Sequence, residues 1–272
     1  MLTLFNYFQV FIIGICIGSF INVVVYRIQK NLSIIIPRSF CPSCKNKLSI
    51  RENIPLISYF FQRGKCLNCN VSISSRYPII EFLTGIIFII SINGSPSFYV
   101  SNSNIILNLF FNWVFLSLLI CITLIDIDSF WIPQGLINFG FITGVLGLMF
   151  IGLFDNRNMD FYLLIKGLST SVASFFIFES LRYFSKICFK KDALGKGDSK
   201  LVAMLGLWLG PFGILFAVGI SYIFAAIYCL VGFSINLVRS GQVIPFAPFL
   251  SLGGLFIWLL GNEYIFEKVL RI

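Results

Sequence analysis

Two aspartates at the ends of apolar segments are the residues of this chain best placed to do chemistry. Asp126 closes the apolar run 105–125, and Asp198 precedes the apolar run 201–210. A carboxylate in or beside a bilayer is costly, so such a residue is a functional-site hypothesis by default. The chain contains no histidine, which excludes Ser–His and Cys–His nucleophiles and histidine metal sites. Acid–base chemistry is therefore assigned to carboxylates.

An aspartate pair has a well-defined chemical use. Two carboxylates that share a site do not readily both ionise, so one holds a proton while the other acts as a base. Such a pair can activate a water molecule against a peptide carbonyl. Gly195 and Gly197 flank Asp198, and we expect them to allow a close or left-handed backbone and to leave room for an extended substrate strand.

Simpler interpretations of the same residues stay open at this point. Asp198 or Ser199 could cap the next helix, whose free N–H groups need an acceptor. Asp126 and Asp128 could form the solvated end of a span. An Asp-x-Asp sequence can also coordinate a divalent cation in sugar transferases.

Four cysteines form two closely similar motifs. Cys41-Pro42-Ser43-Cys44 and Cys66-Leu67-Asn68-Cys69 enclose 21 residues between them. Paired CxxC motifs at this distance are typical of a zinc site with four thiolates, here Cys41, Cys44, Cys66 and Cys69. Four thiolates leave no open coordination position, so the predicted metal is structural. Two redox disulfides or unpaired thiols are the alternatives.

The elements that position these residues are apolar helices. Hydrophobic residues make up 58% of the chain and charged residues 11%, which is the composition of an all-α polytopic membrane protein. The apolar runs predict about eight transmembrane helices, with seven or nine possible, at 4–26, 78–93, 105–125, 135–154, 161–181, 201–210, 212–238 and 246–260. The run 201–210 is too short to cross alone. The Gly210-Pro211 pair predicts either a turn or a kink within one helix.

Charge placement predicts the topology. Between Arg27 and Tyr77 there are nine basic residues and one acid, whereas 91–104 carries no charge. The positive-inside rule then puts the first loop in the cytoplasm and the amino terminus outside. A second basic block, 182–200, lies on the same side after two further crossings. Next to a membrane, topology and anionic lipid explain basic loops better than nucleic acid does, so no nucleic-acid partner is expected.

Beyond these features, several blocks in order resemble the type IV prepilin leader peptidases, membrane aspartyl proteases of the GxGD class. The resemblance covers almost the whole chain. Its blocks are Gly18-Ser19-Phe20-Ile21-Asn22-Val23-Val24-Val25-Tyr26-Arg27, Pro37-Arg38-Ser39-Phe40 before the cysteines, Ile54-Pro55-Leu56-Ile57-Ser58-Tyr59, Arg63-Gly64-Lys65-Cys66, Arg76-Tyr77-Pro78 with Glu81, Asp126 with Ile132-Pro133, Gly195-Lys196-Gly197-Asp198-Ser199-Lys200-Leu201, and Ile244-Pro245-Phe246-Ala247-Pro248-Phe249-Leu250. Ala247 stands where the family commonly has glycine.

The resemblance implies a reaction, its residues and its partners. It implies removal of a short basic leader from type IV prepilin or pseudopilin precursors at the cytoplasmic face of the bacterial inner membrane. Asp126 and Asp198 match the catalytic aspartates, and Gly195, Gly197 and Lys200 are the expected supporting residues. Members with the cysteine loop usually also methylate the new amino terminus with S-adenosylmethionine. No GxGxxG fingerprint supports that second activity here.

The implied organisation has two regions. Residues 1–93, with the cysteine loop at 27–77, form a methyltransferase-associated region with a structural zinc. Gly64 and Glu81 are the candidates there for methyl-donor binding. Residues 105–272 form the peptidase core. The alternatives are a proton-coupled transporter, a non-enzymatic assembly protein, and a peptidase that does not methylate; the oligomeric state is open.

Overall fold

The computed structural model describes residues 4–93, 105–154, 161–189, 195–239 and 242–260. The chain divides into two compact units, Met1–Asn93 and Gly94–Ile272. Part of the second basic block, 190–194, and residues 261–272 of the expected peptidase core lie outside the described residues. Within the described ranges the fold is all-helical, with eight α-helices and no β-strand, which confirms the predicted fold class.

The first unit is built on two helices, α1 (Leu4–Gln29) and α3 (Arg76–Asn93), which pack against each other. A Cβ added at Gly14 or at Gly18 of α1 would lie only 2.7 Å from a Cα atom of α3. Small residues at a membrane helix interface allow this close approach of the two backbones. The cysteine loop between these helices contains a 3₁₀ turn, η1 (Arg51–Asn53), and a short helix, α2 (Ile57–Phe61).

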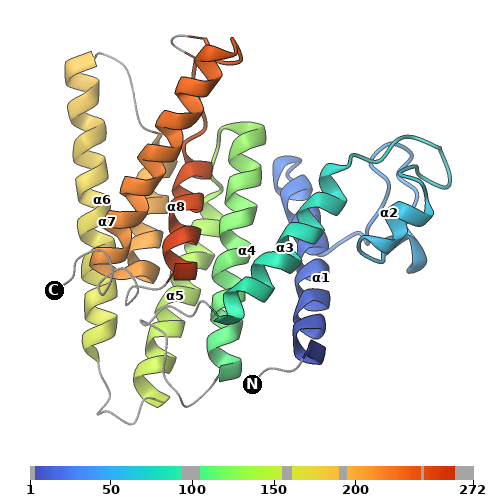
Figure 1. Cartoon of the computed structure of the whole chain (residues 1–272), viewed down its shortest axis with the longest axis horizontal. Coiled ribbons are helices and arrows are strands. Elements are labelled where there is room, and N and C mark those ends of the chain that lie inside the picture. Colours follow the sequence, from blue (N-terminus) through green and yellow to red (C-terminus); the bar gives the residue numbers. More distant parts are fainter. Residues whose placement is uncertain (1–3, 94–104, 155–160, 190–194, 240–241, 261–272) are drawn as a thin grey trace. The chain divides into compact units, whose positions relative to one another are not determined.

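In its described part, the second unit is a helical bundle (Figure 1) that consists of α4 (Ile105–Ser129), α5 (Gln134–Phe154), α6 (Phe161–Phe189), α7 (Lys196–Ser234) and α8 (Ala247–Leu260). Its core contains an aromatic cluster. Phe115 of α4 stacks on Trp208 of α7 with ring centroids 4.7 Å apart, and Trp258 of α8 lies 4.5 Å from the same phenylalanine. Aromatic pairs of this kind contribute about 0.5–1.5 kcal/mol each beyond their buried area.

Helix α7 consists of two helical segments joined at Gly210. This glycine has φ 70° and ψ −179°, a backbone conformation that interrupts the helix immediately before Pro211. An electrostatic interaction links Asp198, at the start of α7, to Tyr222 in its second segment. A straight helix would separate these residues by about 36 Å. The chain therefore turns at Gly210, as the Gly-Pro pair predicts, and the sixth and seventh predicted spans are the two segments of α7.

Among the described residues, four helices are long and apolar enough to cross a membrane by length and composition: Tyr7–Gln29, Ile106–Ser129, Tyr162–Cys188 and Lys196–Ser234. The last of these is the interrupted helix α7. Gln134–Phe150 and Ala247–Leu260 are shorter apolar helices. Apolar segments of this number and length are typical of a polytopic membrane protein.

Candidate active site and metal centre

Asp126 lies in the last turns of α4 and is buried, with 5% of its surface exposed. The helix ends at Ser129, and the next residue, Phe130, has φ 53° and donates its N–H to the carbonyl oxygen of Asp126. One carboxylate oxygen of Asp126, Oδ2, accepts a hydrogen bond of 3.2 Å from the N–H of Ala247. Ala247 is the first residue of α8, so its N–H has no acceptor within that helix and is satisfied by the carboxylate.

Asp198 lies in the first turn of α7 and is also buried, with 7% of its surface exposed. Its Oδ2 accepts a hydrogen bond of 3.0 Å from the N–H of Gly195, the residue that precedes the helix. The N-cap residue is thus Gly195, not Asp198 or Ser199 as the capping interpretation predicts, and Asp198 at the third helical position binds back to the N–H of that N-cap residue. Capping and burial occur together, and the hydrogen bond fixes the orientation of the carboxylate.

The expected role of the two glycines is corrected by the backbone. Gly195 has φ −68° and ψ 146°, and Gly197 lies inside α7, so neither adopts the left-handed conformation. A Cβ at Gly197 would instead lie 3.0–3.2 Å from three carbon atoms of the Ile132 side chain. The close neighbour of Gly197 is thus a side chain of the α4–α5 turn.

Two contacts hold the α4–α5 turn against the start of α7. The first is the packing of Ile132 on Gly197. The second is a hydrogen bond of 2.5 Å from Lys200 Nζ to Gln134 Oε1. Since Asp126 ends α4 and Asp198 begins α7, these contacts bring together two carboxylates 72 residues apart in the sequence. The charge of Asp126 acts on Asp198.

Two residues near this pair, Glu179 and Tyr222, are not among the site residues predicted from the sequence. Ser199 donates a hydrogen bond of 3.1 Å to Glu179 of α6, which also forms an ion pair with Arg182. Tyr222 interacts electrostatically with Asp198 and packs on Phe246 at a centroid distance of 5.3 Å. The spacing of Glu179 and Arg182 indicates their pairing. Nothing in the sequence indicates that Tyr222 lies near Asp198, because this depends on the turn at Gly210.

The four cysteines of the first unit form one cluster. The Sγ atoms of Cys41, Cys44, Cys66 and Cys69 all lie within 4.8 Å of one another. The sulfur atoms of Cys41 and Cys69 are 3.9 Å apart. A tetrahedral zinc ion with Zn–S bonds of about 2.3 Å places its sulfur ligands about 3.8 Å apart. The donor set and its spacing are compatible with a structural zinc ion.

The two cysteine motifs have the same local structure. In each motif, the residue after the second cysteine donates its N–H to the carbonyl oxygen of the first cysteine. These hydrogen bonds run from Lys45 to Cys41 at 2.8 Å and from Asn70 to Cys66 at 2.9 Å. Both Lys45 and Asn70 have positive φ. Backbone N–H groups of Cys69 and Asn68 lower the pKa of the Cys66 thiol to about 7. A lower thiol pKa favours the thiolate, which is the form that binds a metal.

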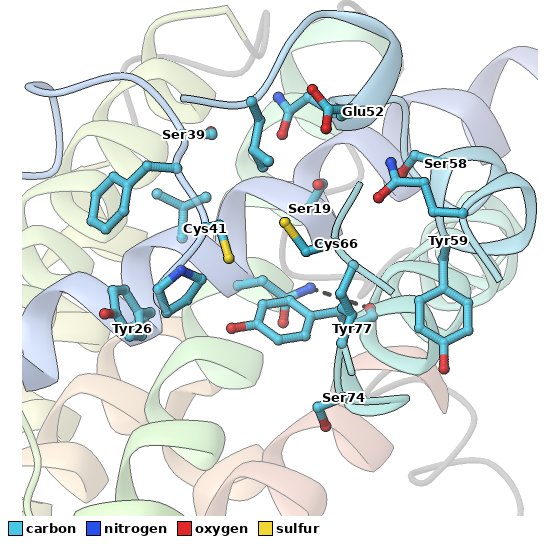
Figure 2. Close-up of a pocket in the computed structure, with 18 of the residues that line it drawn as sticks. Ser19, Tyr26, Ser39, Cys41, Glu52, Ser58, Tyr59, Cys66, Ser74 and Tyr77 are labelled. Atoms are coloured by element: carbon cyan, nitrogen blue, oxygen red, sulfur yellow. Dashed lines mark hydrogen bonds between the residues drawn. The ribbon is translucent and has the colours of Figure 1, made fainter. Parts of the chain in front are cut away.

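A cavity of about 380 Å³ lies between α1, α3 and the cysteine loop, entirely within the first unit. Figure 2 shows Cys41 and Cys66 beside each other in its wall, with Tyr77 nearby. Glu81, one of the two candidates for methyl-donor binding, lines this cavity. Gly64, the other candidate, is not among its lining residues. Gly64 has φ 66° and lies beside the hydroxyl end of Tyr59, a residue that does line the cavity.

Comparison with known proteins gives matches over most of the chain. Residues 12–93 match the Bacterial Peptidase A24 N-terminal domain, and residues 113–230 match the Type IV leader peptidase family. A protein of Escherichia coli O78:H11 named "Type 4 prepilin-like proteins leader peptide-processing enzyme" is 32% identical over 261 residues, which cover 89% of each chain. A "Prepilin leader peptidase/N-methyltransferase" of Legionella pneumophila is 31% identical over 96% of this chain and 93% of that protein.

A third relative with the same printed name, from Neisseria gonorrhoeae, is 29% identical over 95% of this chain and 91% of its own length. No solved structure matches. The similarity therefore extends across both compact units and includes the aspartate pair and the cysteine cluster. The chain belongs to the type IV leader peptidase family.

Proposed function

We propose that this protein removes the leader from type IV prepilin-like precursors and then N-methylates the new terminal residue. The names of the relatives, which describe prepilin leader peptidases and N-methyltransferases, support both activities. The convergence of Asp126 and Asp198 carries the proteolytic part, because two neighbouring carboxylates can supply both the acid and the base in a chain that has no histidine. The relatives do not favour the transporter alternative.

In the proposed reaction, one aspartate acts as base and the other as acid. The ionised carboxylate accepts a proton from a water molecule, whose oxygen attacks the carbonyl carbon of the scissile peptide. The protonated carboxyl donates its proton to the leaving nitrogen as the C–N bond breaks. The backbone donors from Ala247 and Gly195 keep Asp126 and Asp198 oriented for these steps.

Gly195, Gly197 and Lys200 are proposed as supporting residues that act through the aspartates. Gly195 supplies the N–H that binds Asp198. Gly197 and Lys200 hold the start of α7 against the α4–α5 turn, through Ile132 and Gln134 respectively. Their role is to set the distance between the two carboxylates.

The aspartate pair is tested by single replacements with asparagine. We expect Asp126→Asn and Asp198→Asn each to lower the rate of leader removal by about 10²–10⁴-fold or more, because neither amide can act as a general acid or base. Cleavage of a prepilin by the purified protein, followed by gel mobility, measures this. Zinc content and membrane insertion serve as controls and should be unchanged. Normal processing by either variant would rule out the pair.

The proposed cofactors belong to the first unit. A structural zinc ion would be held by Cys41, Cys44, Cys66 and Cys69, whose sulfur atoms already cluster. S-adenosylmethionine is the proposed methyl donor, with Glu81 and Gly64 as candidate binding residues in or beside the cavity. In this scheme residues 1–93 serve methylation and residues 105–272 form the peptidase core.

The proposed setting is the bacterial inner membrane, with the amino terminus outside and the active site at the cytoplasmic face. The apolar helices support a membrane location, and the basic loops support the orientation. The partners are then prepilin or pseudopilin precursors and the lipid bilayer. A peptidase that does not methylate is the second candidate. The mass of a processed pilin amino terminus separates the two, because one methyl group adds about 14 Da.

A further inference from the structure

The cavity of the first unit contains a buried carboxylate with neutral partners. Glu81 has 8% of its surface exposed, and its Oε2 accepts a hydrogen bond of 2.7 Å from the N–H of Leu56. Ser19 is a further hydrogen-bond partner. Within the described ranges, no basic side chain forms an ion pair with Glu81. Because a buried carboxylate is stabilised most by a positive charge, this site favours a cationic ligand.

The other charges at the cavity point to the same ligand. Glu52 also lines it, and hydrogen bonds from Ser49 lower the pKa of the Glu52 carboxyl, so that it stays ionised. Arg27 is the cation in the wall, but its guanidinium is directed to carbonyl oxygens of the loop: it donates to Ser33 O and Ile34 O at 2.9 Å each and to Pro37 O. The cavity thus has more negative than positive charge available to a ligand.

Aromatic rings surround the same space. The cavity is lined by Tyr26 of α1, Phe40 of the loop, Tyr59 of α2 and Tyr77 of α3, and Figure 2 shows the three tyrosines around it. Aromatic faces attract cations and stack on planar heterocycles. A volume of about 380 Å³ lies within the range of small-molecule sites, about 300–1,000 Å³. The lining therefore fits a ligand that combines a positive charge with a flat ring.

We propose that this cavity is the methyl-transfer site, with Glu81 beside the positive charges of the methyl donor and of the incoming terminal amine. This inference rests on the proposed N-methyltransferase function and assigns it a place and a charged residue. Both reactants are cations at neutral pH, and S-adenosylmethionine also carries an adenine ring. The cysteine motifs contribute Cys41, Pro42 and Cys66 to the wall. The zinc ion would accordingly maintain the shape of the donor cavity.

The chemistry assigns Glu81 a defined task. When bound, S-adenosylmethionine supplies a methyl group on a positively charged sulfur; as this C–S bond breaks, its electrons stay on sulfur and S-adenosylhomocysteine is released. The terminal amine must be neutral to offer the electron pair that forms the new N–C bond. Glu81 accepts the proton that the terminal ammonium loses. Its charge also holds the ammonium near the donor before that step.

The test compares two ligands that differ in charge. Glu81→Gln keeps a carbonyl oxygen that can accept the Leu56 N–H but removes the negative charge. We expect this variant to bind S-adenosylmethionine about tenfold or more weakly, while its affinity for S-adenosylhomocysteine, whose sulfur carries no charge, changes less than twofold. Isothermal titration calorimetry of the purified full chain measures both constants without any need for turnover.

Controls separate this inference from the proposed function. The Asp198→Asn substitution lies in the other compact unit, so this variant should bind both ligands like the parent protein. The zinc content of the Glu81→Gln variant reports whether its cysteine loop is still folded. Equal weakening of both ligands, or no change for either, would overturn the assignment of Glu81. If the parent protein methylates pilin but a Tyr77→Ala variant binds both ligands normally, the cavity is the wrong site. If the parent neither binds nor methylates, the proposed methylation itself is wrong.

Discussion

At the scale of single residues, each proposed catalytic aspartate is held by a backbone N–H at the start of a helix. Ala247 supplies this donor to Asp126, and Gly195 supplies it to Asp198. Backbone donors depend little on side-chain identity, so the alanine at position 247 supplies this bond as well as a glycine would. Gly197 is the nearby position where residue size matters most, because the side chain of Ile132 leaves no room for a larger residue.

The first prediction concerns this contact. Gly197→Ala places a new Cβ atom 3.0–3.2 Å from three side-chain carbons of Ile132. One of these is the Cβ of Ile132, which cannot move away without its backbone. We expect the α4–α5 turn to move away from α7 and leader removal to fall about tenfold or more, since small displacements at an active site have large effects on rate. A prepilin cleavage assay measures this. Gly135→Ala is the matched control, because a Cβ there meets no atom within 4 Å. Equal activity of the two variants would contradict the packing role of Gly197.

At the scale of elements, the interruption of α7 determines the shape of the proposed peptidase core. The first segment is almost completely buried from Leu201 to Leu209, and it packs among α5, α6 and α8. At about 1.5 Å per residue this segment is shorter than the ~30 Å hydrocarbon core of a bilayer. The turn at Gly210 returns the chain, so that Tyr222 of the second segment lies near Asp198. Aromatic residues of this segment thus become part of the active-site surroundings.

The second prediction concerns the turn. Gly210 has φ 70° and ψ −179°, a region that is essentially restricted to glycine. We expect Gly210→Ala to lower the stability of the protein by about 1–3 kcal/mol and to reduce leader removal, because the backbone strain is relieved by displacing one segment of α7. Thermal unfolding in detergent, together with the cleavage assay, measures both effects.

Gly219 provides the comparison for this variant. It lies in the second segment of the same helix, with no atom within 4 Å of an added Cβ. Since alanine favours a helix over glycine by about 1 kcal/mol, Gly219→Ala should be neutral or slightly stabilising. A Gly210→Ala protein as stable as Gly219→Ala would mean that the turn does not need glycine.

At the scale of the whole molecule, the two proposed activities belong to different compact units. The cysteine cluster and the Glu81 cavity lie in Met1–Asn93, whereas Asp126 and Asp198 lie in Gly94–Ile272. Each unit has its own packing core, formed by α1 and α3 in one and by the Phe115–Trp208–Trp258 cluster in the other. Damage to one site should therefore leave the other largely intact.

The third prediction follows from this division. We expect the parent protein to contain about one zinc ion per chain. We expect Cys66→Ser, or removal of zinc by a chelator, to abolish pilin N-methylation and S-adenosylmethionine binding while leader removal continues, because the metal stabilises only the unit that holds the donor cavity. Elemental analysis and mass spectrometry of the processed pilin measure the two outcomes. Simultaneous loss of cleavage and methylation would show that the units depend on each other.

The sequence alone determined the features that depend on composition and local pattern. Apolar segments of membrane length predict the all-helical fold, and paired CxxC motifs predict the four-sulfur cluster; both are confirmed. The Gly210-Pro211 pair predicts the break in α7. These features can be predicted because each is encoded by residues close together in the chain, through hydrophobic length, ligand spacing or backbone conformation.

Only the tertiary structure decided what surrounds the reactive groups. The donor from Ala247 to Asp126, the approach of Tyr222 to Asp198 and the cavity around Glu81 all join residues that are distant in sequence. Of the two alternatives expected at Gly195 and Gly197, the left-handed conformation is wrong, whereas a close approach does occur at Gly197, which accommodates Ile132 from another element. Such contacts follow from how helices pack. Many packings satisfy the same pattern of apolar segments, so the pattern does not determine which distant side chains meet.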